Sequence, residues 1–255
     1  MFGSPSRAGS SDAGESSRPG ADAGAGAPAP SPVTIDELVL ADEPERWAGL
    51  GFAVAGDVVQ LGSVRVRLAG CGAGRGIVGW SLRGLASSQL DGLATTASHS
   101  AQPDAGPEHR NGIAAIDHVV AMTPDLDRSV RALQGAGLDL RRIREQPTPA
   151  GAPRQAFFRL GAEILEVVQE PERVVAERGG ADRPVRLWGL ALLAPDLDRT
   201  VGALAPHAGA VRDAVQQGRR IATLERSAGL AVPVALMSPR SDRARAQAPA
   251  SPLAG

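Results

Sequence analysis

Residues 113–171 read IAAIDHVVAMTPDLDRSVRALQGAGLDLRRIREQPTPAGAPRQAFFRLGAEILEVVQEP, and the pattern predicts a strand, a helix and three more strands. Residues 116–122 form a short apolar run rich in β-branched side chains, typical of a buried strand. Thr123, Pro124 and Asp125 then supply an N-cap hydroxyl, a proline for the first helical position and an acid for the first turn. Gly135 and Gly137 end the helix. Strands are expected over 138–143, 155–160 and 162–169, the last two joined through Gly161.

The amino-acid composition limits the kinds of partner that this protein is expected to bind. The 255 residues carry a formal net charge of −1, and every basic residue is arginine. Nothing in this balance attracts nucleic acid or an anionic membrane, and no apolar run is long enough for a membrane span. The single cysteine, Cys71, excludes an intramolecular disulfide and a multi-cysteine metal site. We therefore expect a cytoplasmic protein with no nucleic-acid partner and no membrane association.

The pattern of residues 113–171 occurs more than once in the chain. The segment PDLDR appears at 124–128 and again at 195–199, each time after an apolar strand-like run. Residues 33–70 repeat the same order, with a strand, a short helix over 44–50 and three short strands. A weaker echo begins at Gly76 and reads either as the strand and stunted helix of another unit or as one closing strand.

These repeats predict an α+β chain of βαβββ modules between two tails. His99 and His109 fall in a polar linker and are expected to be solvated. The expected parts are disordered tails over 1–32 and 240–255, a shortened module over 33–93, a linker over 94–112, and full modules over 113–171 and 172–239.

A unit that opens with IDHVV, continues through PDLDRSV and GLDLRR, and closes with RQAFFRLGAEILEVV resembles a module of the vicinal oxygen chelate (VOC) superfamily. That superfamily includes glyoxalase I, the bleomycin-resistance proteins and the extradiol dioxygenases. The resemblance implies that two modules pair into a curved sheet around a small-molecule cavity. It also implies a metal held by His118 on the first strand and Glu166 on the last.

Imidazole and carboxylate donors suit divalent zinc, nickel, iron or manganese, and an open coordination position lets two neighbouring substrate oxygens bind the ion. A glyoxalase-type lyase or isomerase would use Glu166, or Glu37, to move a proton, whereas a dioxygenase would bind oxygen on iron. Both reactions need at least three protein ligands. If the first module faces the second, Glu37, His118 and Glu166 would form such a set.

The third repeat departs from this pattern. Gly189 matches His118, and a residue near Val234 matches Glu166; neither can hold a metal. In the first repeat the matching residues are Glu37 and, approximately, Arg67. The alternative to a metal-dependent enzyme is therefore a metal-free binding or sequestering protein of bleomycin-resistance type, as a monomer or a homodimer.

Each candidate residue also has a structural interpretation. His118 alone could be a hydrogen-bonded cavity wall, Glu166 could form a salt bridge to Arg154 or Arg159, and Glu37 could be an edge-strand charge. Strict alternation places Asp117 on the face opposite His118.

Two further groups of side chains could meet a ligand. Arg219 and Arg220 could bind an anionic group or form a solvated edge. The aromatic residues on strand-like runs are candidates for a cavity lining, although core packing is the favoured role for each taken singly: Trp80, Phe157, Phe158 and Trp188.

Overall fold

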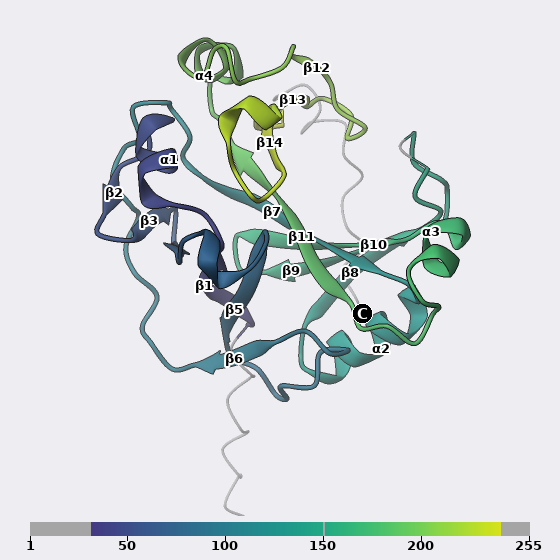
Figure 1. The fold of residues 1–255 in the computed structure, drawn as a ribbon. Coiled ribbons are helices and arrows are strands. Elements are labelled where there is room, and N and C mark those ends of the chain that lie inside the picture. The colour runs from purple at the N-terminus through teal and green to yellow at the C-terminus, as the bar shows by residue number, and fades with distance from the viewer. Residues whose placement is uncertain (1–31, 150, 241–255) are drawn as a thin grey trace, which may run out of the picture. The chain divides into compact units, whose positions relative to one another are not determined.

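The computed structural model describes residues 32–149 and 151–240, so nearly all of the two expected tails lies outside the described residues. The described chain forms two β-sheets with short helices (Figure 1). The six-stranded sheet has the order β2-β3-β4-β1-β5-β6. Its elements are β1 (Thr34–Leu40), α1 (Pro44–Gly49), β2 (Val54–Ala55), β3 (Val58–Leu61), β4 (Val64–Leu68), β5 (Ile77–Arg83) and β6 (Thr95–Ser98).

The eight-stranded sheet has the order β12-β13-β14-β11-β7-β10-β9-β8. Its first half comprises β7 (Ala115–Thr123), α2 (Leu126–Gly135), β8 (Asp139–Arg144), β9 (Gln155–Leu160) and β10 (Glu163–Gln169). After α3 (Glu172–Glu177), the second half comprises β11 (Arg186–Leu193), α4 (Leu197–Ala203), β12 (Arg212–Asp213), β13 (Arg220–Thr223) and β14 (Val234–Met237). The two βαβββ patterns expected from the repeats are thus present.

The halves of the larger sheet are related by their pairing. In each half the first strand runs parallel to the last, β7 to β10 and β11 to β14. The two first strands, β7 and β11, pair antiparallel at the centre. This arrangement places one face of both modules in a single continuous surface.

The smaller sheet repeats this scheme in reduced form. β1 is parallel to β4 and antiparallel to β5, and β5 is parallel to β6. The weak repeat that begins at Gly76 therefore supplies only two strands, β5 and β6. They correspond to the first and last strands of a fourth module that lacks the helix and the middle strands. Residues 95–98, which we expected in a linker, form that last strand.

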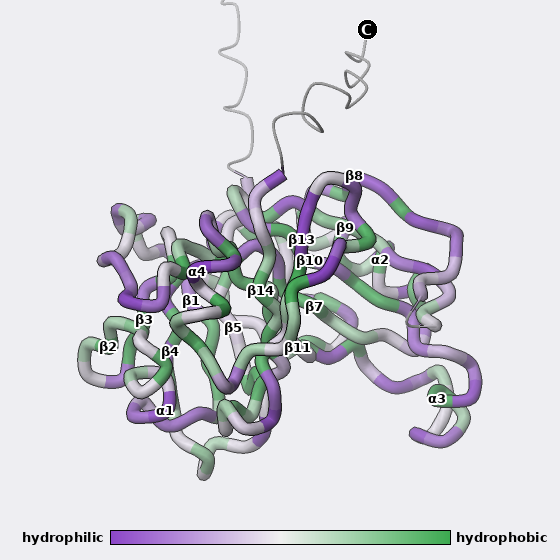
Figure 2. Tube along the Cα trace, turned by 90° about the horizontal axis from the view of Figure 1, so that it is seen from above, coloured by the Kyte–Doolittle hydropathy of each residue, from purple (hydrophilic) through white to green (hydrophobic). Residues whose placement is uncertain are grey.

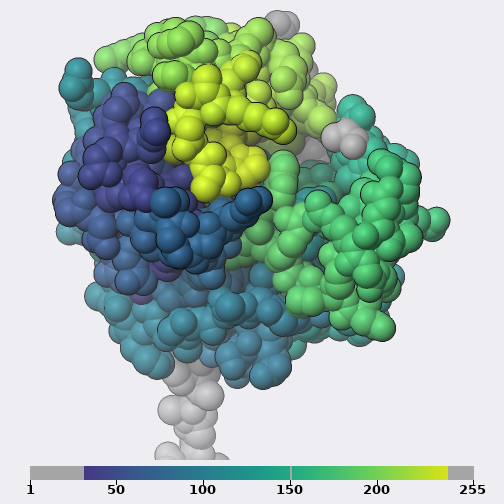
Figure 3. Space-filling model, viewed as in Figure 1, coloured from purple at the N-terminus to yellow at the C-terminus, as the bar shows by residue number. Residues whose placement is uncertain are grey.

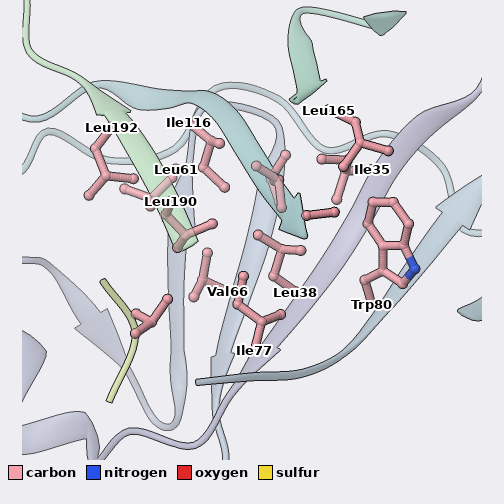
Figure 4. Close-up of a cluster of buried hydrophobic side chains, with 14 of the residues drawn as sticks. Ile35, Leu38, Leu61, Val66, Ile77, Trp80, Ile116, Leu165, Leu190 and Leu192 are labelled. Atoms are coloured by element: carbon pink, nitrogen blue, oxygen red, sulfur yellow. The ribbon is translucent and has the colours of Figure 1, made fainter. Parts of the chain in front are cut away.

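Both sheets contribute to one hydrophobic core (Figure 4). Alternate side chains along each strand enter it, such as Leu38 and Leu40 on β1 or Leu190 and Leu192 on β11, all at most 2% exposed. In Figure 2 the hydrophobic colour is clear along the central strands, and hydrophilic colour marks the loops near α3. The opposite face of each sheet is left open to carry polar groups.

The repeated PDLDR segments begin the two equivalent helices. The carboxylates of Asp125 and Asp196 accept hydrogen bonds from the backbone N–H groups of Arg128 at 2.9 Å and Arg199 at 3.1 Å. The expected cap by Thr123 is thus replaced by Asp125, because Thr123 lies two positions before the N-cap and its hydroxyl instead bonds the Asp125 backbone.

The N-terminal and C-terminal elements pack directly on each other, as the purple-blue and yellow regions of Figure 3 show. The buried carboxylate of Asp42 accepts hydrogen bonds from the backbone of Ala231 and the indole of Trp47. Burial raises the pKa of Asp42, in opposition to these two hydrogen bonds. This contact joins the start of the smaller sheet to the last module.

Candidate functional site

A β-bulge in β7 places two consecutive polar side chains on the same face. His118 pairs with Ala191 and Ile116 with Leu192, so Asp117 has no opposite residue. Ile116 and Val119 are both buried in the core, and the two residues between them therefore face away from it. Our expectation that Asp117 lies opposite His118 was wrong, because strict alternation fails at a bulge.

The same bulge occurs at the same place in every module. Asp36 on β1, Trp188 on β11 and Val78 on β5 are the unpaired residues, and each is followed by the residue equivalent to His118. Those following residues are Glu37, Gly189 and Gly79. The bulge is thus the device by which this fold presents two neighbouring residues on the open face.

His118 and Glu166 meet on the open face of the larger sheet. Nε2 of His118 lies 3.3 Å from Oε2 of Glu166, and both side chains are mostly buried, at 13% and 14% exposed. The side-chain amide of Gln155 on β9 donates to the other Glu166 oxygen. The expected alternatives for Glu166 were salt bridges to Arg154 or Arg159, but Arg154 pairs with Glu145 and Asp127, and Arg159 bonds a backbone carbonyl.

Asp117 holds the other side of the imidazole. Its Oδ2 lies 2.8 Å from Nδ1 of His118. Arg219, at the start of β13, donates to both oxygens of Asp117 and also to the backbone carbonyl of Ser238. Arg219 is therefore part of the site, whereas Arg220 pairs with exposed Asp198.

The two carboxylates are shifted in opposite directions. Burial raises the pKa of Glu166, and the charges of His118 and Arg142 oppose this only in part. Burial also acts on Asp117, but hydrogen bonds from His118 and Arg219 outweigh it and hold the pKa of Asp117 below its ordinary value. Asp117 is therefore an anion at neutral pH, whereas burial favours the protonated form of Glu166.

The surface around these groups is mostly apolar. The register places Val120 beside Glu166, and Phe157 between Glu166 and Arg142, whose guanidinium carbon lies 4.5 Å from the Phe157 ring centre. His118 lies between Ala191 and Ile164. Because Leu187 and Leu190 pack on the core, Trp188 shares the open face and is 43% exposed there.

The aromatic residues divide between the two roles considered for them. Phe157 and Trp188 lie on the open face. Phe158 is fully buried in the core, and Trp80 is buried with its indole bonded to Thr95.

The equivalent positions in the last module cannot repeat the site. Gly189 matches His118, and a Cβ atom there would lie 3.0 Å from the carbonyl oxygen of Pro233. Val120 pairs with Glu166, and its equivalent Ala191 pairs with Ala235. The counterpart of Glu166 is therefore Ala235 and not Val234, a shift of one residue that only the strand register reveals.

Glu37 does not join His118 and Glu166. It lies on β1 of the smaller sheet, where Arg67 pairs with its Oε1 at 2.7 Å. Arg67 lies opposite Val39, the equivalent of Val120, so it is the counterpart of Glu166 as expected.

Of the two linker histidines, His99 is exposed as expected. His109 is buried, and its ring nitrogens bond the backbone of Ala53 and Gln60. The expectation that His109 is solvated was wrong, because its segment packs onto the smaller sheet.

Similarity to solved structures agrees with this geometry. A fusion protein of a xylose isomerase-like TIM barrel and 4-hydroxyphenylpyruvate dioxygenase has a TM-score of 0.55 and 14% identity, covering 84% of this chain and 50% of the other. Methylmalonyl-CoA epimerase from Mycobacterium tuberculosis has a TM-score of 0.43 and 19% identity, covering 52% of this chain and 93% of the other. A Streptomyces coelicolor methylmalonyl-CoA epimerase variant in complex with 2-nitronate-propionyl-CoA has a TM-score of 0.42 and 17% identity, covering 51% and 99%.

The chain has the VOC fold. The α+β architecture and the expected resemblance are thereby confirmed. No protein-family model and no curated protein matches the sequence. No helix of the described residues is long and apolar enough to span a bilayer.

The donors present do not make a complete VOC metal centre. His118 and Glu166 supply two ligands, and Asp117 orients the imidazole in the way that second-shell carboxylates orient ligating histidines. However, no group of three His, Cys, Asp or Glu side chains suited to a metal occurs in 32–149 and 151–240. Within the part of the chain that the structure describes, His118 and Glu166 are therefore the two His or carboxylate donors that meet at this point of the open face.

Three members of the site were missed from the sequence. Asp117 was assigned to the other face, Gln155 was read as an ordinary strand residue, and Arg142 was one arginine in an arginine-rich strand. The IDE of residues 35–37 and the IDH of residues 116–118 contain the only available signal, a repeated acid before the candidate ligand.

Proposed function

We propose that this protein binds a small molecule on the open face of the eight-stranded sheet, without a metal, as the bleomycin-resistance type of VOC protein does. The observation that carries the proposal is that His118 and Glu166 contact each other directly while their counterparts are Gly189 and Ala235. Because His118 and Glu166 have no third donor beside them among the residues that the structure describes, they act as a hydrogen-bonding pair for a ligand. The ligand is mainly apolar and carries one polar group, because the pair lies among Val120, Ile164, Ala191, Phe157 and Trp188.

Elemental analysis of untagged protein tests the absence of a metal. Wild type, His118→Ala and, as a matched histidine control, His99→Ala should all contain negligible divalent metal. About one equivalent of zinc, nickel, iron or manganese in wild type and His99→Ala, lost in His118→Ala, would overturn the proposal.

Binding itself is tested by thermal-shift screening of a library of small apolar compounds. Compounds that raise the Tm of wild type should have no effect on His118→Ala or Glu166→Ala, and should still stabilise His99→Ala. A library with no such compound, or hits that ignore both substitutions, would contradict the location of the site.

A second candidate is a metal-dependent lyase, isomerase or dioxygenase, favoured by one observation. Asp117 contacts Nδ1 of His118 and leaves Nε2 directed at Glu166. Burial also raises the pKa of Glu166, which is the direction expected of a proton carrier. In this candidate His118 and Glu166 would be ligands, and the elemental analysis decides between the two.

A further inference from the structure

The six-stranded sheet has an open face of its own, with a cavity of about 660 Å³. The bulge at Asp36 turns Asp36 and Glu37 onto this face, as the equivalent bulge does for Asp117 and His118. The cavity is lined by Asp36, Glu37 and Arg67 together with hydroxyl-bearing residues of β5, β6 and the segment that follows: Ser81, Thr95, Thr96, Ser98 and Ser100. Polar and apolar groups share its lining, whereas the surface around His118 and Glu166 on the larger sheet is mostly apolar.

The carboxylate of Asp36 is buried beside this cavity and held by hydrogen bonds, so it is not a solvated surface acid. It is 3% exposed, and it accepts hydrogen bonds from Arg65 at 2.9 Å, Ser98 at 2.6 Å, Ser81 at 3.4 Å and also Arg83. An anion this deeply buried is costly without such partners. The network fixes side chains from β1, β4, β5 and β6 around one point.

The segment after β6 closes one side of the cavity. Nε of Arg83 donates to the carbonyl oxygen of Ser100 at 2.8 Å, which ties residues 98–100 across the ends of β5 and β6. Ser98, His99 and Ser100 all line the cavity. This segment lies in the stretch that we expected to be a linker.

Arg67 is the arginine of the cavity lining, and within the described chain most of its guanidinium is free to bind a ligand. Arg65, Arg67 and Arg83 face the carboxylates of Asp36 and Glu37. Among the described residues only one nitrogen of Arg67 has a partner, Glu37 at 2.7 Å, and the Arg67 side chain is 47% exposed. The buried Nε of Arg65 has no hydrogen-bond partner among the described residues. The guanidinium of Arg67 can therefore pair with one anionic group, next to hydrogen-bonding groups.

We propose that this cavity is a second binding site, specific for a small hydroxylated carboxylic acid. The ligand carboxylate pairs with Arg67, and its hydroxyl groups bond Glu37, Ser81 and Thr96, which the register places in one row across β1, β5 and β6. Neither His118 nor Glu166 lines this cavity, so the site is independent of the proposed function of the larger sheet.

Isothermal titration of the full chain with gluconate tests the proposal, with two matched probes. Glucose has the hydroxyl groups without the charge, and propionate has the charge without the hydroxyl groups. Both should bind at least about tenfold more weakly than gluconate, since each lacks charge-assisted or multiple hydrogen bonds. No gluconate binding up to about 10 mM, or equal binding of all three, would overturn the proposal.

Variants locate the site. Arg67→Gln should weaken gluconate at least about tenfold. Arg131→Gln, an exposed arginine on α2, and His118→Ala should leave the affinity unchanged. Gluconate binding that survives Arg67→Gln, or that is lost in His118→Ala, would place the ligand elsewhere. An unchanged Tm for Arg67→Gln shows that the variant is folded.

Discussion

Arg219, in the turn before β13 in the other half of the larger sheet, donates to the carboxylate of Asp117, 102 residues away in the chain, with one contact at 3.0 Å. Both side chains are largely buried, at 11% and 16% exposed. Because Asp117 in turn holds Nδ1 of His118, the orientation of the imidazole depends on both modules of the VOC sheet.

The first prediction concerns this contact. Asp117→Asn should destabilise the protein by about 1.5–3 kcal/mol at neutral pH, because charged hydrogen bonds to Arg219 and His118 are lost. The folded pKa of Asp117 lies below its ordinary 3.8, so its stabilising effect is present above that value and is lost as the pH falls through the lowered pKa. Urea unfolding of both proteins at pH 7 and at low pH measures the difference.

The neighbouring pair supplies the control for this prediction. Asp198 and Arg220 form the exposed equivalent, at 64% and 46% exposed. Asp198→Asn should change the midpoint of unfolding little, because solvent screens an exposed pair. Equal effects of Asp117→Asn and Asp198→Asn would show that burial of the contact between Asp117 and Arg219 does not matter.

Local sequence patterns were enough to predict the modules, but they were not enough to predict the arrangement of the site. The repeat of PDLDR identified the starts of two equivalent helices, and alternating apolar residues identified the strands that enter the core. The site depends on a β-bulge, which inserts one extra residue into the strand. The residues before the bulge therefore lie on the opposite face from the one that strict alternation predicts. Period-two reasoning therefore misplaced Asp117, and one residue of register separated Val234 from Ala235 as the counterpart of Glu166.

Long-range contacts were also beyond the sequence. Arg219 looked like part of a charged run, and only strand pairing brings it to Asp117. His109 and β6 lay in a segment of linker-like composition, yet packing onto the smaller sheet orders both. Composition reports the average tendency of a segment, and tertiary contacts decide the outcome for its individual residues.

The second prediction concerns the proton on Glu166. Burial raises its folded pKa, so the folded protein holds the proton more tightly than the unfolded chain does, and stability from this group is lost as the pH rises through the folded pKa. Glu166→Gln keeps the shape without the charge. The Tm of Glu166→Gln minus that of wild type should therefore increase from about pH 4 to pH 8.

A matched substitution at an exposed acid checks that assignment. Glu177→Gln, with its side chain 56% exposed, should show no such trend with pH. A difference for Glu166→Gln that is constant or decreases over the same range would mean that His118 and Arg142 dominate over burial.

The third prediction concerns Glu170, which follows β10 and joins it to the segment before β11. Its side chain is 1% exposed and contacts Arg183 at 2.6 Å, Arg186 at 3.2 Å and Arg178 at 3.4 Å. Glu170→Gln should cost at least about 2 kcal/mol, because three guanidinium groups lose their anion. Denaturant unfolding should show this loss, and a cost no larger than that of Glu177→Gln would contradict it.

The last prediction tests why the last module cannot carry a ligand at the position of His118. Gly189→Ala should destabilise by about 1–3 kcal/mol, because the new Cβ would lie 3.0 Å from the Pro233 carbonyl oxygen. Gly202→Ala on α4 has open space around its Cβ and should stabilise by about 0.5–1 kcal/mol through helix propensity. Urea unfolding compares the two. A Gly189→Ala variant as stable as wild type would mean that the backbone gives way easily, so that a side chain could be accommodated at this position, opposite Val120.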